Sequence, residues 1–469
     1  MIGTTSIFLA GLPAMAAAMD AQRSGINEPA GNDLAELERR TADIWGPDNV
    51  WIPSPHVLVQ YETDLGERSS VDFENGVVQV QILLKAGDNP GREIVLAHLR
   101  QGVGNLILRE AKDPVEMIKA QGSETRPAVP NNVPAAALPA GREIRVYLVR
   151  RGDSLWKIAR QFRMKTEELA KLNGLTADKT LNPGLPLKVM VYSSHDLTLD
   201  SAPPSPSKDP LLLDQIRMVD GRPVPPWLVR EFAAEVVGDK PHATKKVVGA
   251  DGVERLAVGV SFKLVSNHLE VRARKFHSLV QSHAQKHELD PAVIMAIIHT
   301  ESFFNPRARS RTPAYGLMQL SPSTGAREAF RMLYAKKQKL TAQYLYNPKN
   351  NIELGTAYFN ILENKYMGKI LDPKSRTYCA VGAYNAGAAN VGRAFISKKS
   401  FNQAAPVVNR LKPTEVYARL VASLPYSESR NYVRKVFSRT RLYREWQISD
   451  HQQSWGFEEG PSKGPAGGR

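Results

Sequence analysis

The chain of 469 residues contains a single cysteine, Cys379. One thiol excludes an intramolecular disulfide and a zinc site built on cysteines. We interpret Cys379 as a small, buried apolar residue. The ten histidines include no pair at a metal-binding spacing such as HExxH. The sequence therefore predicts no metal site and indicates no cofactor.

Long apolar runs are also scarce. After residue 19, no stretch comes close to the roughly 18 apolar residues that a membrane-spanning helix needs. Residues 2–19 are small or apolar, carry no charge before Asp20, and contain alanines at 16–18 that fit a signal cleavage site. We interpret residues 1–19 as an export signal, although the usual lysine or arginine ahead of the apolar stretch is missing. No cysteine follows this stretch, so no lipid attachment is expected.

Proline concentrates in two stretches, residues 126–139 and 201–207, which predict extended linkers. Between them lies a piece of about 50 residues, while the whole length suits about three domains of roughly 150 residues. We expect residues 208–260, beyond the second linker, to complete an N-terminal α+β domain that begins with residues 40–120. The Gly- and Pro-rich tail at 456–469 is expected to be disordered.

The first part of the chain has strand patterns and the last part has helical ones. Residues 57–61 and 77–82 alternate apolar and polar side chains, as half-buried strands do. A turn is predicted between them, over residues 69–76, and residues 92–108 have apolar positions at helical spacing. From about residue 267 onward the pattern is helical nearly throughout. The expected order is a small α+β domain followed by a mainly α domain.

The piece between the linkers, residues 141–192, holds a predicted strand, two short helices and a second strand. Asp153 or Ser154 can cap the first helix. With the sequence GDSLW at 152–156, this piece resembles the LysM family. The resemblance implies a βααβ fold that binds glycans containing N-acetylglucosamine, such as peptidoglycan; a spacer that binds nothing is the alternative. We expect Trp156 to belong to the core rather than to contact a ligand.

The helical part contains a carboxylate at a helix end. Asp290 and Pro291 predict the start of an apolar helix and Pro306 predicts its end, so Glu301 falls in the last turn. The negative end of the helix dipole and the two phenylalanines that follow disfavour an ionised carboxylate, so the pKa of Glu301 is expected to rise. A carboxylic acid that stays protonated near neutral pH suits a general acid for glycosidic cleavage.

Further motifs follow Glu301 in a fixed order: Ser310, AYGLMQL at 314–320, AVGAYNAG at 380–387 and PYSESRNY at 425–432. Together they resemble the lysozyme-like catalytic domain of the soluble lytic transglycosylase superfamily. Within it, the chain most resembles the family of membrane-bound lytic murein transglycosylase C. Four more stretches carry this closer resemblance: IWG at 44–46, VDFENG at 71–76, NHLEVRAR at 267–274 and DPKSRTY at 372–378.

The resemblance implies a reaction without water. Glu301 protonates the bond after N-acetylmuramic acid, then acts as a base on the C6 hydroxyl, which closes a 1,6-anhydro ring. The resemblance gives substrate-binding roles to six residues that lie near the acid in the family: Ser310, Met318, Gln319, Tyr384, Asn385 and Tyr432. Among these, Tyr432 is expected to hydrogen-bond to Glu301 and hold it.

Two other functions stay open. Residues 302–327 contain no Asp or Glu, so the nearby sequence offers no second carboxylate of the kind that hydrolases place roughly 5–9 Å from the acid. A partner could still come from elsewhere in the fold, which leaves a lysozyme-like muramidase that uses water as an alternative. A non-catalytic peptidoglycan-binding scaffold is the second alternative. Glu428 and Arg430 are expected to pair structurally rather than to catalyse.

The expected fold class is therefore α+β multidomain, with a mainly α lysozyme-like catalytic domain at residues 261–448, a small α+β N-terminal domain and a βααβ LysM-like insert. Peptidoglycan glycan strands are the expected partner, and cell-wall synthesis or division proteins are further candidates. We expect an exported protein of the periplasm or cell envelope, with association to the outer membrane left open.

Charge is distributed unevenly along the chain, whose net charge is +15. Residues 31–120 hold 9 basic and 15 acidic side chains, a net charge of −6, whereas residues 301–469 hold 27 and 11, a net charge of +16. A basic catalytic half favours approach to an anionic wall polymer. Nucleic acid is not an expected partner, because the six basic residues between Arg430 and Arg444 match no recognition motif.

Overall fold

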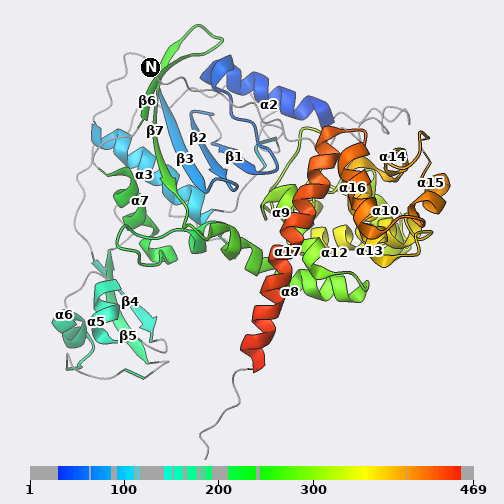
Figure 1. Cartoon of the computed structure of the whole chain (residues 1–469). Helices are drawn as coiled ribbons and strands as arrows, with labels where there is room; N and C mark the ends of the chain where they lie inside the picture. Colours follow the sequence, from blue (N-terminus) through cyan, green and yellow to red (C-terminus); the bar gives the residue numbers. More distant parts are fainter. Residues whose placement is uncertain are drawn as a thin grey trace, which may run out of the picture.

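The computed structural model describes most of the chain between residues 30 and 455 (Figure 1). The described residues are 30–62, 65–85, 92–109, 113–115, 142–149, 153–161, 166–176, 181–182, 185–192, 210–238, 243–398 and 400–455. The expected export signal, both proline-rich stretches and the tail at 456–469 lie outside these residues.

A five-stranded antiparallel sheet, in the order β1-β2-β3-β7-β6, forms the first unit (Figure 1). Its strands are β1 (Val57–Tyr61), β2 (Glu67–Asp72), β3 (Val77–Lys85), β6 (Ala243–Val248) and β7 (Glu254–Lys263). β3 and β7 pair from Val77 opposite Lys263 to Lys85 opposite Arg255. The sheet therefore joins strands from both sides of the second proline-rich stretch. We call it, with its helices, the sheet domain.

Helices cover both faces of this sheet (Figure 1). They are α2 (Ala30–Trp45), α3 (Arg92–Leu108) and α7 (Val229–Val237), with the short 3-10 turns η1 (Pro47–Asn49), η3 (Leu213–Gln215) and η4 (Pro226–Leu228). Leu99 and Phe232 pack on one face, and Trp45 packs on the other. Adjacent β1 residues divide between the two cores, with Leu58 in the first and Val59 in the second, because successive strand side chains point to opposite faces.

Two sequence expectations for this domain are corrected by the structure. Residues 69–72, expected within a turn, belong to β2, and only residues 73–76 turn. The polar sequence there has weak strand propensity, but its backbone pairs with both β1 and β3, and this pairing overrides the local preference. In addition, α2 begins at Ala30, so the expected start at residue 40 falls inside a helix.

The insert is a βααβ unit with its own core. Its elements are β4 (Arg142–Leu148), α5 (Leu155–Gln161), α6 (Thr166–Leu172) and β5 (Pro186–Tyr192), and the two strands pair antiparallel. Ser154 accepts a 3.3 Å hydrogen bond from the Lys157 backbone N–H, which caps α5. The expectation for Trp156 is wrong, because its side chain is 56% exposed. Leu155 and Ile158 face the core, and the residue after Leu155 is rotated away from it.

The second unit, which we call the helical domain, surrounds α9 (Pro291–Ser302). Every α9 residue except Pro291 and Thr300 is buried, so this helix is covered on all sides. Its other helices are α8 (His268–Lys286), α10 (Gly325–Tyr334), α11 (Ala342–Tyr346), α12 (Pro348–Asn360), the π-helix η5 (Ile361–Tyr366), α13 (Pro373–Ala386), α14 (Ala388–Arg393), α15 (Phe401–Val408), α16 (Pro413–Ser423) and α17 (Ser427–Trp455). Cys379 is fully buried in α13, as expected.

Helix α17 runs alongside α9 and then extends past the helical domain (Figure 1). Val433, Val436 and Tyr443 carry its buried face into the core around α9. The expected domain end at residue 448 falls inside this helix, which continues to Trp455. Among the helices that the structure describes, none is both long enough and apolar enough to cross a membrane.

A buried arginine joins the two domains. Arg272 on α8 is 1% exposed, and it donates a 3.0 Å hydrogen bond from Nε to the carbonyl of Phe303 and a 2.7 Å bond from Nη2 to the carbonyl of Phe73. Phe303 packs in the core of the sheet domain, while Phe304 packs in that of the helical domain. Phe303 and Phe304, which follow the last turn of α9, therefore attach the helix end that carries Glu301 to the cores of both domains.

Candidate active site

The helix that carries Glu301 is fixed at both ends. At its start, the Asp290 side chain accepts a 2.9 Å hydrogen bond from the Ala292 N–H, as expected for a cap. At its end, Phe303 and Phe304 take left-handed conformations with φ of 50° and 59°. This backbone is unfavourable for phenylalanine and persists because both rings are packed in cores. The two phenylalanines end the helix at Ser302, so the prediction that Pro306 ends it is corrected.

Glu301 is a buried carboxyl with one fixed and one open oxygen. Glu301 is 2% exposed, and its Oε1 accepts a 2.8 Å hydrogen bond from the hydroxyl of Tyr432 on α17. Oε2 has no hydrogen-bond partner among the described residues. Burial raises the pKa of Glu301 to about 8; the Tyr432 hydroxyl opposes this rise, and the nearby charge of Glu428 adds to it. The rise expected from the sequence is therefore found, with desolvation as its main cause.

Tyr384 on α13 lies near this carboxyl. Its pKa is raised well above the ordinary value by burial first and then by the charge of Glu301, so the two groups are near each other. The Tyr384 hydroxyl donates a 2.8 Å hydrogen bond to the backbone carbonyl of Met318. The Met318 side chain is fully buried and packs against Gly355, where an added Cβ would collide with the sulfur. Met318 therefore reaches the site through its backbone.

A second carboxyl, Glu428, lies on the same face of α17 as Tyr432, one helical turn away. Burial raises the pKa of Glu428 to about 7, while a hydrogen bond with Asn385 lowers it. Asn385 also accepts a 2.6 Å hydrogen bond from Ser429. The expected pairing of Glu428 with Arg430 is wrong, because residues two apart on a helix face different ways. Arg430 instead donates to the carbonyl of Leu424.

Neither the position of Glu428 near Glu301 nor the contact of Ser429 with Asn385 was predicted from the sequence. A signal for Glu428 was present, since its spacing of four from Tyr432 puts both side chains on one helical face. The contact between Ser429 and Asn385 joins residues 44 apart in the chain, so no local sequence pattern predicts it. Three helices thus bring the predicted site residues together: α9 carries Glu301, α13 carries Tyr384 and Asn385, and α17 carries Tyr432. Glu428, also on α17, lies beside them.

Ser310 and Gln319 lie on a compact loop, residues 305–320. Ser310 is 2% exposed; its hydroxyl donates to the carbonyl of Thr312 and accepts a 3.2 Å hydrogen bond from the Ala314 N–H. The amide nitrogen of Gln319 donates to the Gly316 carbonyl at 3.0 Å. Its Oε1 is buried and has no partner among the described residues. This atom and Oε2 of Glu301 are therefore two buried oxygens with unused hydrogen-bonding capacity.

Glycine at position 316 is required by space as well as by turn geometry. Its φ is 76°, and an added Cβ would collide with the Leu345 carbonyl and the Asn351 side chain. Asn351 holds the loop from α12: its Oδ1 accepts from the Met318 N–H at 2.8 Å and its Nδ2 donates to the Tyr315 carbonyl at 2.8 Å. Sequence reasoning did not identify Asn351, because it lies about 30 residues beyond the motif it supports.

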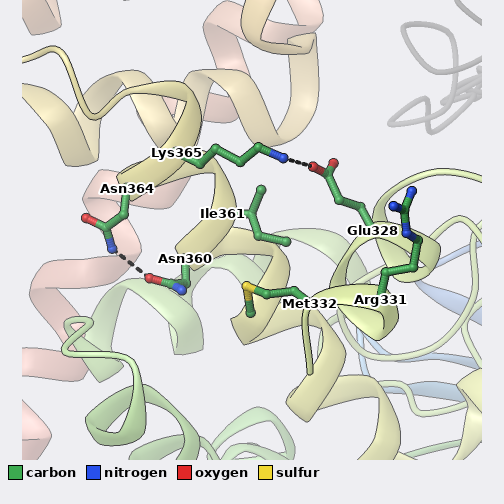
Figure 2. A pocket seen from close by; sticks show the side chains of 7 residues that line it. All are labelled: Glu328, Arg331, Met332, Asn360, Ile361, Asn364 and Lys365. Carbon is green, nitrogen blue, oxygen red and sulfur yellow. Dashed lines mark hydrogen bonds and ion pairs between the residues drawn. The ribbon is translucent and has the colours of Figure 1, made fainter. Parts of the chain in front are cut away.

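A surface pocket of about 470 Å³ lies elsewhere on the helical domain, between α10 and η5 (Figure 2). Figure 2 shows Lys365 reaching across it to Glu328, with an N···O distance of 3.0 Å. None of the predicted site residues lines this pocket. Across the described parts of the chain, no three His, Cys, Asp or Glu side chains converge to hold a metal ion.

Comparison with known proteins gives the chain's family. It is 38% identical over 252 residues to membrane-bound lytic murein transglycosylase C from Yersinia enterocolitica, a match that spans 54% of this chain and 68% of that protein. The chain belongs to the membrane-bound lytic murein transglycosylase C family. The family member from Sodalis glossinidius is 28% identical over 411 residues, which covers 88% of this chain and 89% of that protein.

Three family models match successive parts of this transglycosylase C family member. Residues 28–118 match the N-terminal domain of membrane-bound lytic murein transglycosylase C, residues 147–189 match the LysM domain, and residues 278–406 match the transglycosylase SLT domain. Among solved structures, the 70-kDa soluble lytic transglycosylase from Escherichia coli is 25% identical, with a TM-score of 0.29, over 37% of this chain and 24% of that one.

Proposed function

We propose that this protein is a peptidoglycan lytic transglycosylase, with Glu301 as its single acid and base. It cleaves the β-1,4 bond between N-acetylmuramic acid and N-acetylglucosamine without water and leaves 1,6-anhydromuramoyl ends. The observation that carries this proposal is the state of Glu301: a buried carboxyl with one oxygen held by Tyr432 and the other without a partner. Membership of the transglycosylase C family supports it.

The first step is a proton transfer. Since burial raises the pKa of Glu301 to about 8, about nine in ten of these carboxyls are protonated at pH 7. The hydroxyl of Tyr432 already occupies Oε1, so the proton leaves from Oε2 toward the glycosidic oxygen. The bond between C1 of N-acetylmuramic acid and that oxygen breaks, and the leaving sugar keeps the proton. Substrate groups next to C1 stabilise the positive charge that develops there.

The second step returns the proton to the enzyme. Glu301 is now a carboxylate in a buried site, where the charged form is disfavoured and the group is therefore a stronger base than in water. It takes the proton from the C6 hydroxyl of the same N-acetylmuramic acid, and O6 forms a bond to C1. This closes the 1,6-anhydro ring, consumes no water and leaves Glu301 protonated for the next cycle.

The remaining site residues are assigned to holding the glycan and the acid. Tyr432 fixes the orientation of the Glu301 carboxyl, and Tyr384 with Asn385 orients the sugar beside it. Gln319 offers the buried, unpartnered Oε1 to a sugar hydroxyl or amide, and Ser310 and Met318 shape the loop that lines the sugar site. In support, hydrogen bonds connect Tyr432 to Glu301 and Tyr384 to Met318.

The other parts of the chain suit the same substrate. The LysM-like insert binds glycan through an exposed surface that includes Trp156, so it keeps the enzyme on its polymer. The protein acts in the cell envelope after export to the periplasm. Proteins of cell-wall synthesis or division are its proposed recruiting partners, and the surplus of basic residues in 301–469 favours approach to the anionic wall.

A muramidase that uses water is the second candidate, and Glu428 is the observation in its favour. Glu428 lies near enough to raise the pKa of Glu301, so a second carboxyl is present despite its absence from residues 302–327. A pKa raised to about 7 leaves Glu428 only partly ionised at neutral pH, however, and it is engaged by Asn385. This weakens it as a base for water.

The test of the assignment is Glu301→Gln. The variant should lose glycan cleavage by at least about a thousandfold, the scale expected when the only proton donor is removed. It should still sediment with purified sacculi, because the LysM-like insert is untouched. Cleavage by the variant at the wild-type rate would refute Glu301 as the acid. Absence of cleavage by the wild type itself would instead favour the scaffold alternative.

A further inference from the structure

The loop at residues 305–320 depends on contacts outside its own motif. Two β-bridges fold it, one between Arg309 and Tyr315 and one between Tyr315 and Leu320. These bridges fix its internal shape but not its place in the domain. Asn351 holds the second half of the loop from α12. The place of Ser310, in the first half, therefore depends on what holds the side chain of its neighbour Arg309.

Arg309 is held by the sheet domain. Its side chain is 4% exposed, and Nη1 lies 2.7 Å from Oδ2 of Asp113, whose side chain is also 4% exposed. The hydroxyl of Tyr346 on α11 donates a 2.8 Å hydrogen bond to the same Asp113 oxygen. Asp113 follows α3, and its neighbour Val115 packs with the core beneath α2. One carboxylate thus connects the sheet domain, the loop and α11.

A second ion pair joins the same two domains on the other side of Ser310, but it is exposed. Arg311 lies 3.9 Å from Glu38 of α2, with side chains 69% and 49% exposed. Exposed pairs of this kind are screened by water and fix little. Removing one partner of a buried pair instead leaves an uncompensated charge, which the surrounding chain must move to solvate. The two pairs form a natural comparison within one loop.

We infer that Asp113 is a positioning residue for the glycan-binding loop, acting through Arg309 to set the place of Ser310 and Gln319 relative to Glu301. This inference rests on the proposed function of that loop. Asp113 touches neither Glu301 nor Tyr432 in any described contact. Its loss should therefore weaken glycan binding and leave the acid unchanged. The sheet domain, through this contact, becomes part of the substrate-binding apparatus.

The experiment compares KM and kcat on soluble, uncrosslinked glycan strands for the full-length protein. Asp113→Asn should raise KM about tenfold and change kcat less than about twofold, since misplacement of a binding group by a fraction of an ångström has effects of this order. Asp113→Glu, which keeps the charge, should bring KM back to within about threefold of wild type. Glu38→Gln, which breaks the exposed ion pair with Arg311, is the matched control and should leave both KM and kcat unchanged.

The pH profile separates positioning from general loss of structure. The alkaline limb of kcat/KM, which reports Glu301, should stay in place in Asp113→Asn. An unchanged KM in a folded Asp113→Asn protein, or a fall in kcat at constant KM, would overturn the inference. If near-ultraviolet circular dichroism shows that this variant does not fold, Tyr346→Phe decides. This variant removes only the Tyr346 hydroxyl that donates a hydrogen bond to Asp113, and it should raise KM about threefold. An unchanged KM would overturn the inference.

The outcome is separable from that of the proposed function. Product analysis of the wild type decides whether cleavage gives anhydro ends, whatever the variants do. The ratio of KM values between Asp113→Asn and wild type decides the positioning role, whichever product forms.

Discussion

The hydroxyl of Tyr432 on α17 lies 2.8 Å from Oε1 of Glu301 on α9 and donates a hydrogen bond to it. This contact lowers the pKa of Glu301, while burial and the charge of Glu428 raise it. The balance leaves a pKa of about 8, so the carboxyl is protonated at neutral pH and can still lose its proton, as the proposed mechanism requires. Tyr432 therefore fixes the direction of the acid and limits how far its pKa rises.

Activity should fall as the pH rises through about 8. The proposed acid must be protonated, and Glu301 loses its proton through a pKa of about 8. The plot of log kcat/KM against pH should be level below this value and then decline with a slope of −1. The measurement uses soluble glycan strands between pH 6 and 10. A decline of kcat/KM that begins near pH 4.5 would contradict this prediction, because it would show that the activity depends on a carboxyl group with an ordinary pKa.

Tyr432→Phe should move this alkaline limb upward. The hydroxyl favours the ionised form of Glu301, so its removal should raise the pKa further. The loss of orientation should lower kcat by about tenfold. Tyr443→Phe is the matched control, because Tyr443 lies on the same helix and contacts His299 of α9 at 3.0 Å instead. A downward shift for Tyr432→Phe, or an equal shift for Tyr443→Phe, would contradict this role.

Glu428→Gln should move the alkaline limb in the opposite direction. Removing a like charge makes ionisation of Glu301 easier, so its pKa should fall and activity should decline at a lower pH. Glu363→Gln serves as the control, since Glu363 is another partly buried carboxyl with a raised pKa, but it does not act on Glu301. If Glu428→Gln abolished activity at every pH, Glu428 would have a chemical role, as the muramidase alternative requires.

Glu301→Gln should stabilise the fold at neutral pH. The folded pKa of Glu301 is about 8 and its ordinary value is 4.5, so between these pH values the folded state keeps a proton that the unfolded chain releases. Stability therefore falls as the pH rises through this window, and the uncharged Gln removes the effect. The gain in unfolding free energy should be about 3 kcal/mol at pH 7 and near zero at pH 4. Urea unfolding at both pH values measures it, and an equal gain at both would contradict the explanation.

Local sequence signals predicted the core of the site. Asp290 and Pro291 start α9 as their capping and φ preferences require, and the apolar run between them and Glu301 places that residue in a buried last turn. The raised pKa follows from this placement. The βααβ order of the insert could also be read from its cap residues, because Ser154 and Thr166 lie directly at the starts of the helices α5 and α6.

Contacts between distant segments could not be predicted in the same way. The polar strand β2 forms only because β1 and β3 both offer backbone partners. The buried pair of Asp113 and Arg309 spans 196 residues, and nothing in the residues around Asp113 distinguishes it from a surface aspartate. The end of α9 at Phe303 depends likewise on packing against two separate cores. Such positions are decided by tertiary structure.

The most direct test of the central claim is the identity of the cleaved end. Purified sacculi are digested with the wild-type protein in water enriched in ¹⁸O, and the released muropeptides are analysed by mass spectrometry. The proposed mechanism gives 1,6-anhydromuramoyl ends without ¹⁸O, because O6 of the substrate closes the ring on C1. Reducing ends that carry ¹⁸O would contradict it, since they would show that water attacks C1 and that the protein is a hydrolase.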